Sequence, residues 1–116
     1  MVSGISVVYL YVRDMERSLA FYRDLLGIPL EGDGDWAEAT FPGGVRFALH
    51  TAHGDEVELG SGTLRIDLEV TDIDAEVARL RAEGVHVGGI VRDSWGAACE
   101  IRDPDGYRLD LFEAPG

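Results

Sequence analysis

The sequence has a single cysteine, no lysine and no long apolar run, and each shortage excludes a class of protein. Because Cys99 is the only cysteine among 116 residues, neither an internal disulfide nor a cysteine-based zinc site can form. The absence of lysine excludes a mechanism that depends on a lysine Schiff base. A membrane-spanning helix needs about 20 apolar residues, and the longest apolar run is far shorter. The first fifteen residues lack the features of a signal peptide. We therefore expect a cytoplasmic protein with no membrane partner.

Positive charge is also scarce. The ten basic residues are all arginines and stand against 22 acidic ones, for a net charge of −12. A surface this negative repels phosphate groups, so we expect no nucleic-acid partner and no anionic lipid surface. A cationic or neutral partner fits this charge better, although solubility alone also explains it. The length of 116 residues predicts a single domain over residues 1–116.

An internal repeat organises the chain. Residues 12–15 (VRDM) have a counterpart 58 positions later at residues 70–73 (VTDI). Alternating stretches at 5–12 and 64–70 precede these motifs and predict strands. Apolar residues at three- and four-residue steps follow and predict helices: Leu19, Tyr22, Leu25 and Leu26 in the first half, and Ile73, Val77 and Leu80 in the second.

The helix ends and the remaining strands also repeat. Asp14 and Asp72 stand where N-caps belong, and Gly27 and Gly84 stand where a helix would end in a left-handed turn. Residues 44–50 align with residues 106–112, now 62 positions apart. Each half therefore predicts a strand, a helix, and two or three further strands, with a linker at 53–62. The further strands are expected at 36–41, 85–91 and 97–101.

Two stretches carry a family resemblance. Residues 11–27 (YVRDMERSLAFYRDLLG) resemble the first strand–helix unit of the vicinal oxygen chelate superfamily, and residues 103–113 (DPDGYRLDLFE) are similar to its ending. This superfamily includes glyoxalase I, bleomycin resistance proteins and extradiol dioxygenases. The resemblance implies an α+β fold of two βαβββ modules, at about 1–55 and 62–116, forming a mixed, strongly curved sheet around a cleft. It leaves the function open, because the superfamily holds both enzymes and binding proteins.

The resemblance also implies where metal ligands would lie. Carried over residue by residue, the four ligand positions on the cleft-facing strands fall on Val7, Ala48, Arg65 and Asp110. Only Asp110 could bind a metal, since two of these side chains are hydrocarbon and the third is a permanent cation. We therefore expect no metal and no cofactor. Arg65 and Asp110 are predicted to form an ion pair across the cleft in place of the metal.

Strand alternation assigns further residues to the cleft face. These are Tyr9, Tyr11, Arg46, His50, Asp67, Glu69, Arg108 and Phe112. The opposite face is apolar and is expected to pack under the helices: Val8, Leu10, Phe47, Leu49, Ile66, Leu68, Leu109 and Leu111.

Aromatic rings beside carboxylates suit a planar organic cation. Trp95-Gly96 resembles the loop with which bleomycin resistance proteins stack on their drug, although Trp95 could instead pack a loop against the core. The predicted ligand-binding residues are Tyr9, Tyr11, His50, Arg65, Asp67, Glu69, Trp95, Asp110 and Phe112. Trp36 is predicted to lie in the core or at an interface.

Other polar residues are weaker candidates. His50 could be a general base, a metal ligand outside the usual positions with Glu69 and Asp110, or a hydrogen-bonded wall residue. His53 and His86 are expected to be solvated, and Cys99 to be a small buried thiol. No partner for Glu38 or Glu100 is recognisable in the sequence.

These residues leave two main functions open. The first is a metal-independent homodimeric binding protein that sequesters an aromatic, cationic natural product such as an antibiotic. The alternative is a lyase, isomerase or dioxygenase, metal-free or with displaced ligands, whose candidate catalytic residues are His50, Arg65 and Asp110. An interaction module with an empty cleft is a third reading, and the charged cleft face counts against it.

Overall fold

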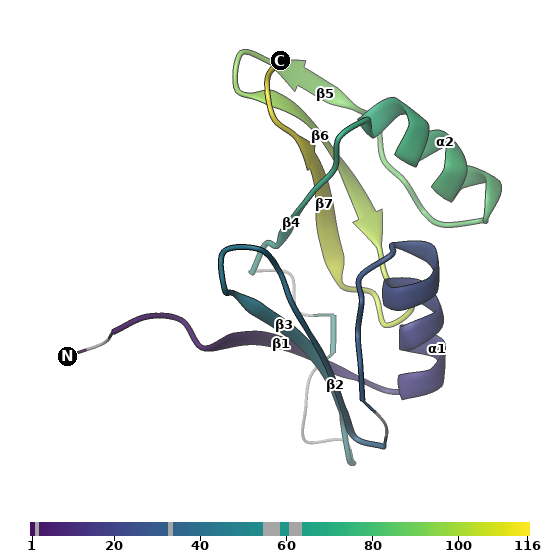
Figure 1. Cartoon of the computed structure of the whole chain (residues 1–116). Coiled ribbons are helices and arrows are strands. Elements are labelled where there is room, and N and C mark those ends of the chain that lie inside the picture. The colour runs from purple at the N-terminus through teal and green to yellow at the C-terminus, as the bar shows by residue number, and fades with distance from the viewer. Residues whose placement is uncertain (2, 33, 55–58, 61–63) are drawn as a thin grey trace. The chain divides into compact units, whose positions relative to one another are not determined.

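The computed structural model describes the whole chain except residues 2, 33, 55–58 and 61–63. The chain divides into two compact units, residues 1–59 and 60–116, each with helix and sheet (Figure 1). The fold is α+β, as predicted. Most of the predicted linker at 53–62 lies outside the described residues. Within the described part of the chain, no helix is long and apolar enough to span a membrane.

The first unit contains a three-stranded sheet and one helical segment. Its elements are β1 (Val7–Val12), α1 (Met15–Leu19), the π-helical continuation η1 (Ala20–Leu25), β2 (Trp36–Thr40) and β3 (Arg46–Thr51). The strand order is β1-β3-β2, with β1 parallel and β2 antiparallel to β3. The parallel pair is possible because the helical segment carries the chain back between β1 and the later strands.

The second unit repeats this plan with one more strand. Its elements are β4 (Asp67–Glu69), α2 (Ile73–Ala82), β5 (Val91–Asp93), β6 (Gly96–Arg102) and β7 (Arg108–Glu113). The order is β4-β7-β6-β5, with β4 parallel to β7 and the other pairs antiparallel. This unit is the predicted βαβββ module.

Helix packing follows the predicted faces. In the first unit Phe21 and Tyr22 are buried, and the Tyr22 ring lies 5.5 Å from that of Phe47 on β3. In the second unit α2 contacts β7, and Ile73 and Leu80 of this helix are fully buried. The apolar sheet residues Leu10, Leu49, Leu109 and Leu111 are likewise buried. Five of the eight residues predicted for the helix-covered faces are therefore buried, whereas Val8, Ile66 and Leu68 are only half-buried.

The predicted helix ends are confirmed. The Asp14 carboxylate accepts a hydrogen bond from the Arg17 amide at 3.2 Å, and Asp72 accepts one from the Ala75 amide at 3.1 Å. Gly27 and Gly84 have φ angles of 78° and 82°, in the left-handed region that glycine adopts without strain.

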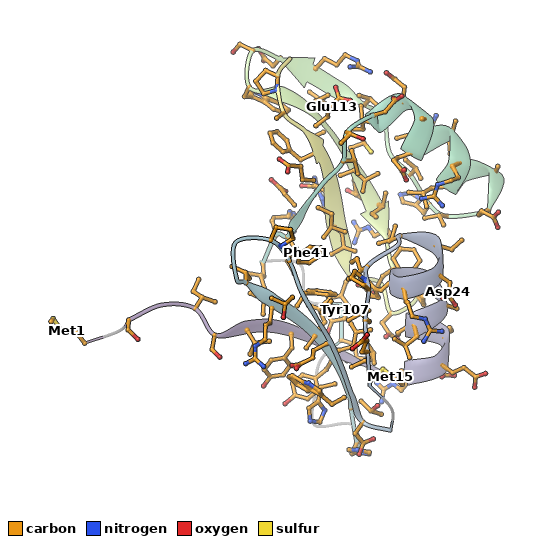
Figure 2. The ribbon with its side chains drawn as sticks, in the orientation of Figure 1. Met1, Met15, Asp24, Phe41, Tyr107 and Glu113 are labelled. Atoms are coloured by element: carbon orange, nitrogen blue, oxygen red, sulfur yellow. The ribbon has the colours of Figure 1, made fainter. Side chains whose placement is uncertain are left out.

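Replacing Asp72 with alanine is expected to lower the free energy of unfolding by about 1 kcal/mol, because it removes the side-chain acceptor at the start of α2. Figure 2 shows Glu113 of β7 near this helix end, where its carboxylate accepts a hydrogen bond from the Ile73 amide at 3.0 Å. Urea unfolding measures the loss. Asp72→Asn should restore most of the stability, and equal stabilities of wild type and Asp72→Ala would contradict the capping role.

The strands differ from prediction in two places. In the first unit the described strands form βαββ rather than the βαβββ that the resemblance implies, and Glu31 forms only an isolated bridge with Glu38. Pro29 has no amide hydrogen to donate to a ladder. Gly32 also interrupts the pairing, because its φ of 144° and its close approach to the Trp36 carbonyl leave no room for a side chain.

The strand predicted at 85–91 is the second correction. Only Val87 bridges to Ile101, and the regular strand β5 begins at Val91, opposite Ala98. Between these pairs the chain advances four residues while its partner advances three, so one extra residue is inserted as a β-bulge.

Candidate functional site

The uncovered face of the first sheet carries a cluster of four rings. The register pairs Tyr9 with Ala48, Tyr11 with His50, and Trp36 with His50 across β1, β3 and β2. Side chains at these positions share one face of the sheet. We call Tyr9, Tyr11, Trp36 and His50 the ring cluster.

The rings of this cluster contact one another. The Tyr11 and His50 centroids are 5.3 Å apart, those of Tyr9 and Trp36 5.5 Å, and those of Trp36 and His50 5.7 Å. The interplanar angles of 57–84° are those of tilted and edge-to-face pairs, which aromatic rings favour. Ala48 on the same face is fully buried, whereas Tyr9 is 42% exposed. The cluster therefore forms a platform with an accessible aromatic surface.

An ion pair holds one edge of this platform. One Glu38 carboxylate oxygen accepts hydrogen bonds from the Trp36 indole at 3.1 Å and from the Arg46 guanidinium at 3.0 Å. The same guanidinium also donates to the hydroxyl and the carbonyl of Ser6. These contacts fix the orientation of Trp36. They also correct the sequence reading that Glu38 has no recognisable partner.

Tyr11 of the cluster remains protonated at neutral pH. A hydrogen bond with Tyr9 is the main cause that raises the pKa of Tyr11, followed by the charge on Tyr9 and lost solvation. The Tyr11 phenol is therefore a neutral hydrogen-bonding group in the cluster.

The second unit has an acidic and aromatic face on the equivalent side of its sheet. Asp67 pairs with Asp110, and Glu69 pairs with Phe112, across β4 and β7. The Trp95 ring lies stacked on Phe112, with centroids 6.4 Å apart and planes 23° from parallel. Trp95 is 47% exposed and so does not pack a loop into the core. This arrangement brings together five of the predicted residues of the second module: Asp67, Glu69, Trp95, Asp110 and Phe112.

A network of ion pairs crosses the same face. Arg108 bridges two carboxylates, since its Nε lies 3.2 Å from Glu100 and 3.3 Å from Asp110. Glu100 also pairs with Arg102 at 2.8 Å. The hydrogen bond from Arg102 is the main cause that lowers the pKa of Glu100, with further contributions from the positive charges of Arg102, Arg108 and His86. Glu100 thus has partners that the sequence did not reveal.

Replacing Glu100 with glutamine is expected to lower stability modestly at neutral pH and not at low pH. Because the folded pKa of Glu100 lies below its unfolded value, its contribution is present above the unfolded value of about 4.3. That contribution is lost as the pH falls through the lowered pKa. Urea unfolding at pH 7 and pH 3 compares the two proteins. Glu83→Gln, at an exposed position without a recorded ion pair in the described structure, is the control. An equal deficit of Glu100→Gln at both pH values would contradict the assignment.

The recorded ion pair of Asp110 is with a different arginine from the one predicted. In the structure this carboxylate contacts Arg108, two residues along the same strand. In register, Asp67 rather than Arg65 stands opposite Asp110. Arg65 lies exposed just before β4, and its pairing with Asp110 remains a prediction.

The four positions carried over for metal ligands do not fit a divalent metal. Val7 and Ala48 offer hydrocarbon, Arg65 is a cation, and Asp110 already binds Arg108. Among the described residues, no group of three or more His, Cys, Asp and Glu side chains could hold a metal ion. The alternative ligand set of His50, Glu69 and Asp110 draws its histidine from the first unit and its carboxylates from the second.

The remaining candidates are one buried cysteine and two exposed histidines. Cys99 is buried, and burial is the main cause that raises the pKa of its thiol, followed by the nearby charge of Asp110, so it is a poor nucleophile. His53 and His86 are exposed, and each lies near a carboxylate, Asp35 at 3.2 Å and Glu100 at 3.7 Å.

Sequence reasoning missed one residue of the ring cluster. Trp36 was predicted to lie in the core or at an interface; it is only partly buried and contacts Tyr9 and His50, and the interface remains a prediction. The available signal was alternation along β2, which places Trp36 on the same face as Glu38. That signal is ambiguous until the register of β2 against β3 is known.

Comparisons with known proteins agree with this architecture. A sequence profile of the Glyoxalase/Bleomycin resistance protein/Dioxygenase superfamily matches residues 4–111. A probable lactoylglutathione lyase of Synechocystis is 28% identical, over 88% of this chain and 88% of that protein. The lactoylglutathione lyase of Haemophilus influenzae is 30% identical, over 90% of this chain and 87% of that protein.

Among solved structures, one similar chain is TnmS3, an antibiotic-binding protein from Streptomyces sp. CB03234. It is 28% identical, with a TM-score of 0.77 over 98% of each chain. A glyoxalase/dioxygenase from Nostoc punctiforme has a TM-score of 0.78 at 21% identity, over 98% of this chain and 92% of that one, and shows the fold alone.

Proposed function

This chain belongs to the glyoxalase/bleomycin resistance protein/dioxygenase superfamily, and on that premise we propose that it binds a planar, cationic organic molecule without a metal. It would sequester this molecule, such as an antibiotic or another natural product, and leave it chemically unchanged. Stacking on exposed rings would supply affinity, and nearby carboxylates would select for positive charge.

The exposed stack of Trp95 on Phe112 is the observation that carries this proposal. A tryptophan that leaves 47% of its surface in water, parallel to a second ring, presents a flat apolar face to a ligand. Glu69 pairs with Phe112 across the strands, and Asp67, two residues earlier on β4, lies on the same face. A planar cation on Trp95 would therefore find carboxylates on the face that it stacks against.

The side chains at the implied metal positions support binding over metal-assisted catalysis. A catalytic divalent site needs about three protein ligands, and three of the four carried-over positions cannot coordinate. The antibiotic-binding function of TnmS3, whose chain aligns along almost its whole length, adds support. We further propose a homodimer, since β1 and β4 are sheet edges in the described structure and an edge strand can pair with a second copy.

A titration of chelator-treated protein tests this function. The probe is the planar cation 3,6-diamino-10-methylacridinium, and tryptophan fluorescence reports its binding. We expect saturable binding of the cation, and at least tenfold weaker binding of a planar sulfonate such as pyrenesulfonate. Equal affinity for the anion, or no binding of the cation, would contradict the proposal.

The alternative function is an enzyme, and the names of the curated relatives favour it. Two of them are lactoylglutathione lyases at 28% and 30% identity. In a metal-free version His50 or Asp110 would act as the base and Arg65 would stabilise an oxyanion. A lactoylglutathione lyase assay with and without added Ni²⁺ or Zn²⁺ separates the two functions. Turnover without added metal would favour the metal-free enzyme, and turnover that depends on the added metal would favour an enzyme with displaced ligands.

A further inference from the structure

The polar groups of the ring cluster are almost all engaged within the first unit. The Trp36 indole donates to Glu38, the Tyr9 and Tyr11 hydroxyls share a hydrogen bond, and His50 Nδ1 lies 2.8 Å from the Thr51 carbonyl oxygen. Within the described part of the chain, no hydrogen bond is recorded for His50 Nε2. This nitrogen is therefore available to a ligand on the platform.

The contact with Thr51 determines which ring nitrogen carries the proton. A carbonyl oxygen can only accept, so Nδ1 must be the donor. In the neutral ring the lone pair then resides on Nε2, because one imidazole nitrogen donates while the other accepts. Contacts with the Tyr11 and Trp36 rings further restrict the orientation of the imidazole. His50 thus places a hydrogen-bond acceptor in an otherwise aromatic surface.

We propose that His50 Nε2 accepts a hydrogen bond from an N–H or O–H group of a planar ligand that stacks on the ring cluster. This inference goes beyond the proposed function, because it adds the ring cluster of the first unit as a stacking surface other than the Trp95–Phe112 face, for aromatic molecules with a ring-attached amino or hydroxyl donor. Tyr9, the ring of this cluster with the large exposed surface, supplies the stacking face. A ligand without such a donor leaves the acceptor unpaired and loses affinity.

Protonation of His50 removes this acceptor and adds a positive charge. The titratable or charged groups that face His50 are Tyr9 and Tyr11 from β1, Glu38 from β2, and Arg46 from β3 itself. Glu38 is paired with Arg46, so it does not stand free to neutralise an imidazolium. A protonated His50 could therefore not accept the hydrogen bond from the ligand.

Two matched acridinium cations test the inference. The 3,6-diamino-10-methylacridinium ion carries N–H donors, whereas 3,6-bis(dimethylamino)-10-methylacridinium has the same ring and charge but no N–H group. We expect the wild type to bind the diamino probe about tenfold more tightly at pH 8. His50→Phe should bind both probes with a ratio near one, since phenylalanine preserves the ring. The chain itself places Phe112 at the repeat-equivalent position of His50.

The control variant is His53→Phe, which makes the same change at an exposed histidine outside the ring cluster. It should retain the tenfold preference. If the wild type binds both probes equally, or if His50→Phe keeps the preference, the role of His50 is overturned while the planar-cation function stands. If the wild type binds neither probe, the proposed function itself fails.

The proton position gives a test that needs no ligand. A two-bond ¹H–¹⁵N spectrum of the histidine rings at pH 8 should show His50 protonated at Nδ1 and unprotonated at Nε2. His50→Phe assigns the signal by its disappearance. A proton on Nε2 would overturn the inference, because that nitrogen could not then accept.

Discussion

Replacing Trp95 with alanine is expected to weaken the binding of the 3,6-diamino-10-methylacridinium cation by about tenfold or more. The variant removes a ring that is 47% exposed and stacked on Phe112. Loss of a cation–π and stacking contact of about 1–2 kcal/mol corresponds to roughly tenfold in affinity. The dissociation constant, measured by isothermal titration calorimetry on chelator-treated protein, reports the effect.

A second exposed aromatic residue provides the control for this variant. Phe41 is 36% exposed and lies at the β2–β3 turn, and the described structure records no ring contact for it (Figure 2). Phe41→Ala should leave the dissociation constant unchanged. An unchanged constant in Trp95→Ala would show that the stack on Phe112 does not contact the ligand. Equal losses in both variants would indicate nonspecific adsorption to exposed aromatic surface.

The second large effect is expected from Gly96→Ala, at the residue that follows Trp95. Gly96 has a φ of 127°, and a Cβ built there would lie 2.3 Å from the Glu113 carbonyl oxygen. It would also lie 3.1 Å from the Phe112 ring. Because the first neighbour is backbone, the clash cannot be relieved by rotating a side chain. Backbone strain and overpacking together should lower the free energy of unfolding by about 3 kcal/mol.

Urea unfolding measures this loss, and Gly89→Ala is the matched control. Gly89 has no heavy atom within 4 Å of an added Cβ and no positive φ, so alanine there should change stability little. Equal stability of Gly96→Ala and wild type would contradict the described turn. If Gly89→Ala lowered the free energy of unfolding as strongly, the loss in Gly96→Ala could not be attributed to the clash.

Local features of the fold were predictable from the sequence because their causes are local. The aspartates at the two helix starts and the glycines after the helices act on backbone groups within a few residues of themselves. Alternation separated the buried Leu49 and Leu109 from residues on the open face, since strand side chains alternate regardless of partner. The duplication then extended each assignment to the other half of the chain.

Features that depend on pairing between strands were not predictable. Trp36 joins the ring cluster only because β2 pairs with β3 in the observed register, which its own alternation cannot specify. Glu100 is held by Arg108 from the neighbouring strand. The β-bulge before β5 likewise depends on a one-residue difference between two partners, Ile101 and Ala98.

The repeat shows how the two open sheet faces came to differ. Glu38 pairs with Arg46, and Glu100 pairs with Arg108 at positions 62 residues later, so the ion pair is common to both units. Around it the side chains diverge. The counterparts of Tyr9 and Tyr11, 58 positions on, are Asp67 and Glu69. One face therefore offers rings and a neutral acceptor, and the other offers carboxylates beside a tryptophan stack.

Native mass spectrometry of the protein as purified, and again after incubation with Ni²⁺ and Zn²⁺, tests the central claim most directly. The spectrum reports the oligomer, any retained metal and any co-purified organic molecule at once. We expect masses that correspond to a dimer of the 12.6 kDa chain, with or without an added organic mass. We expect no stoichiometric metal in either sample. Retention of one divalent metal per chain would contradict metal-independent binding and favour the lyase alternative.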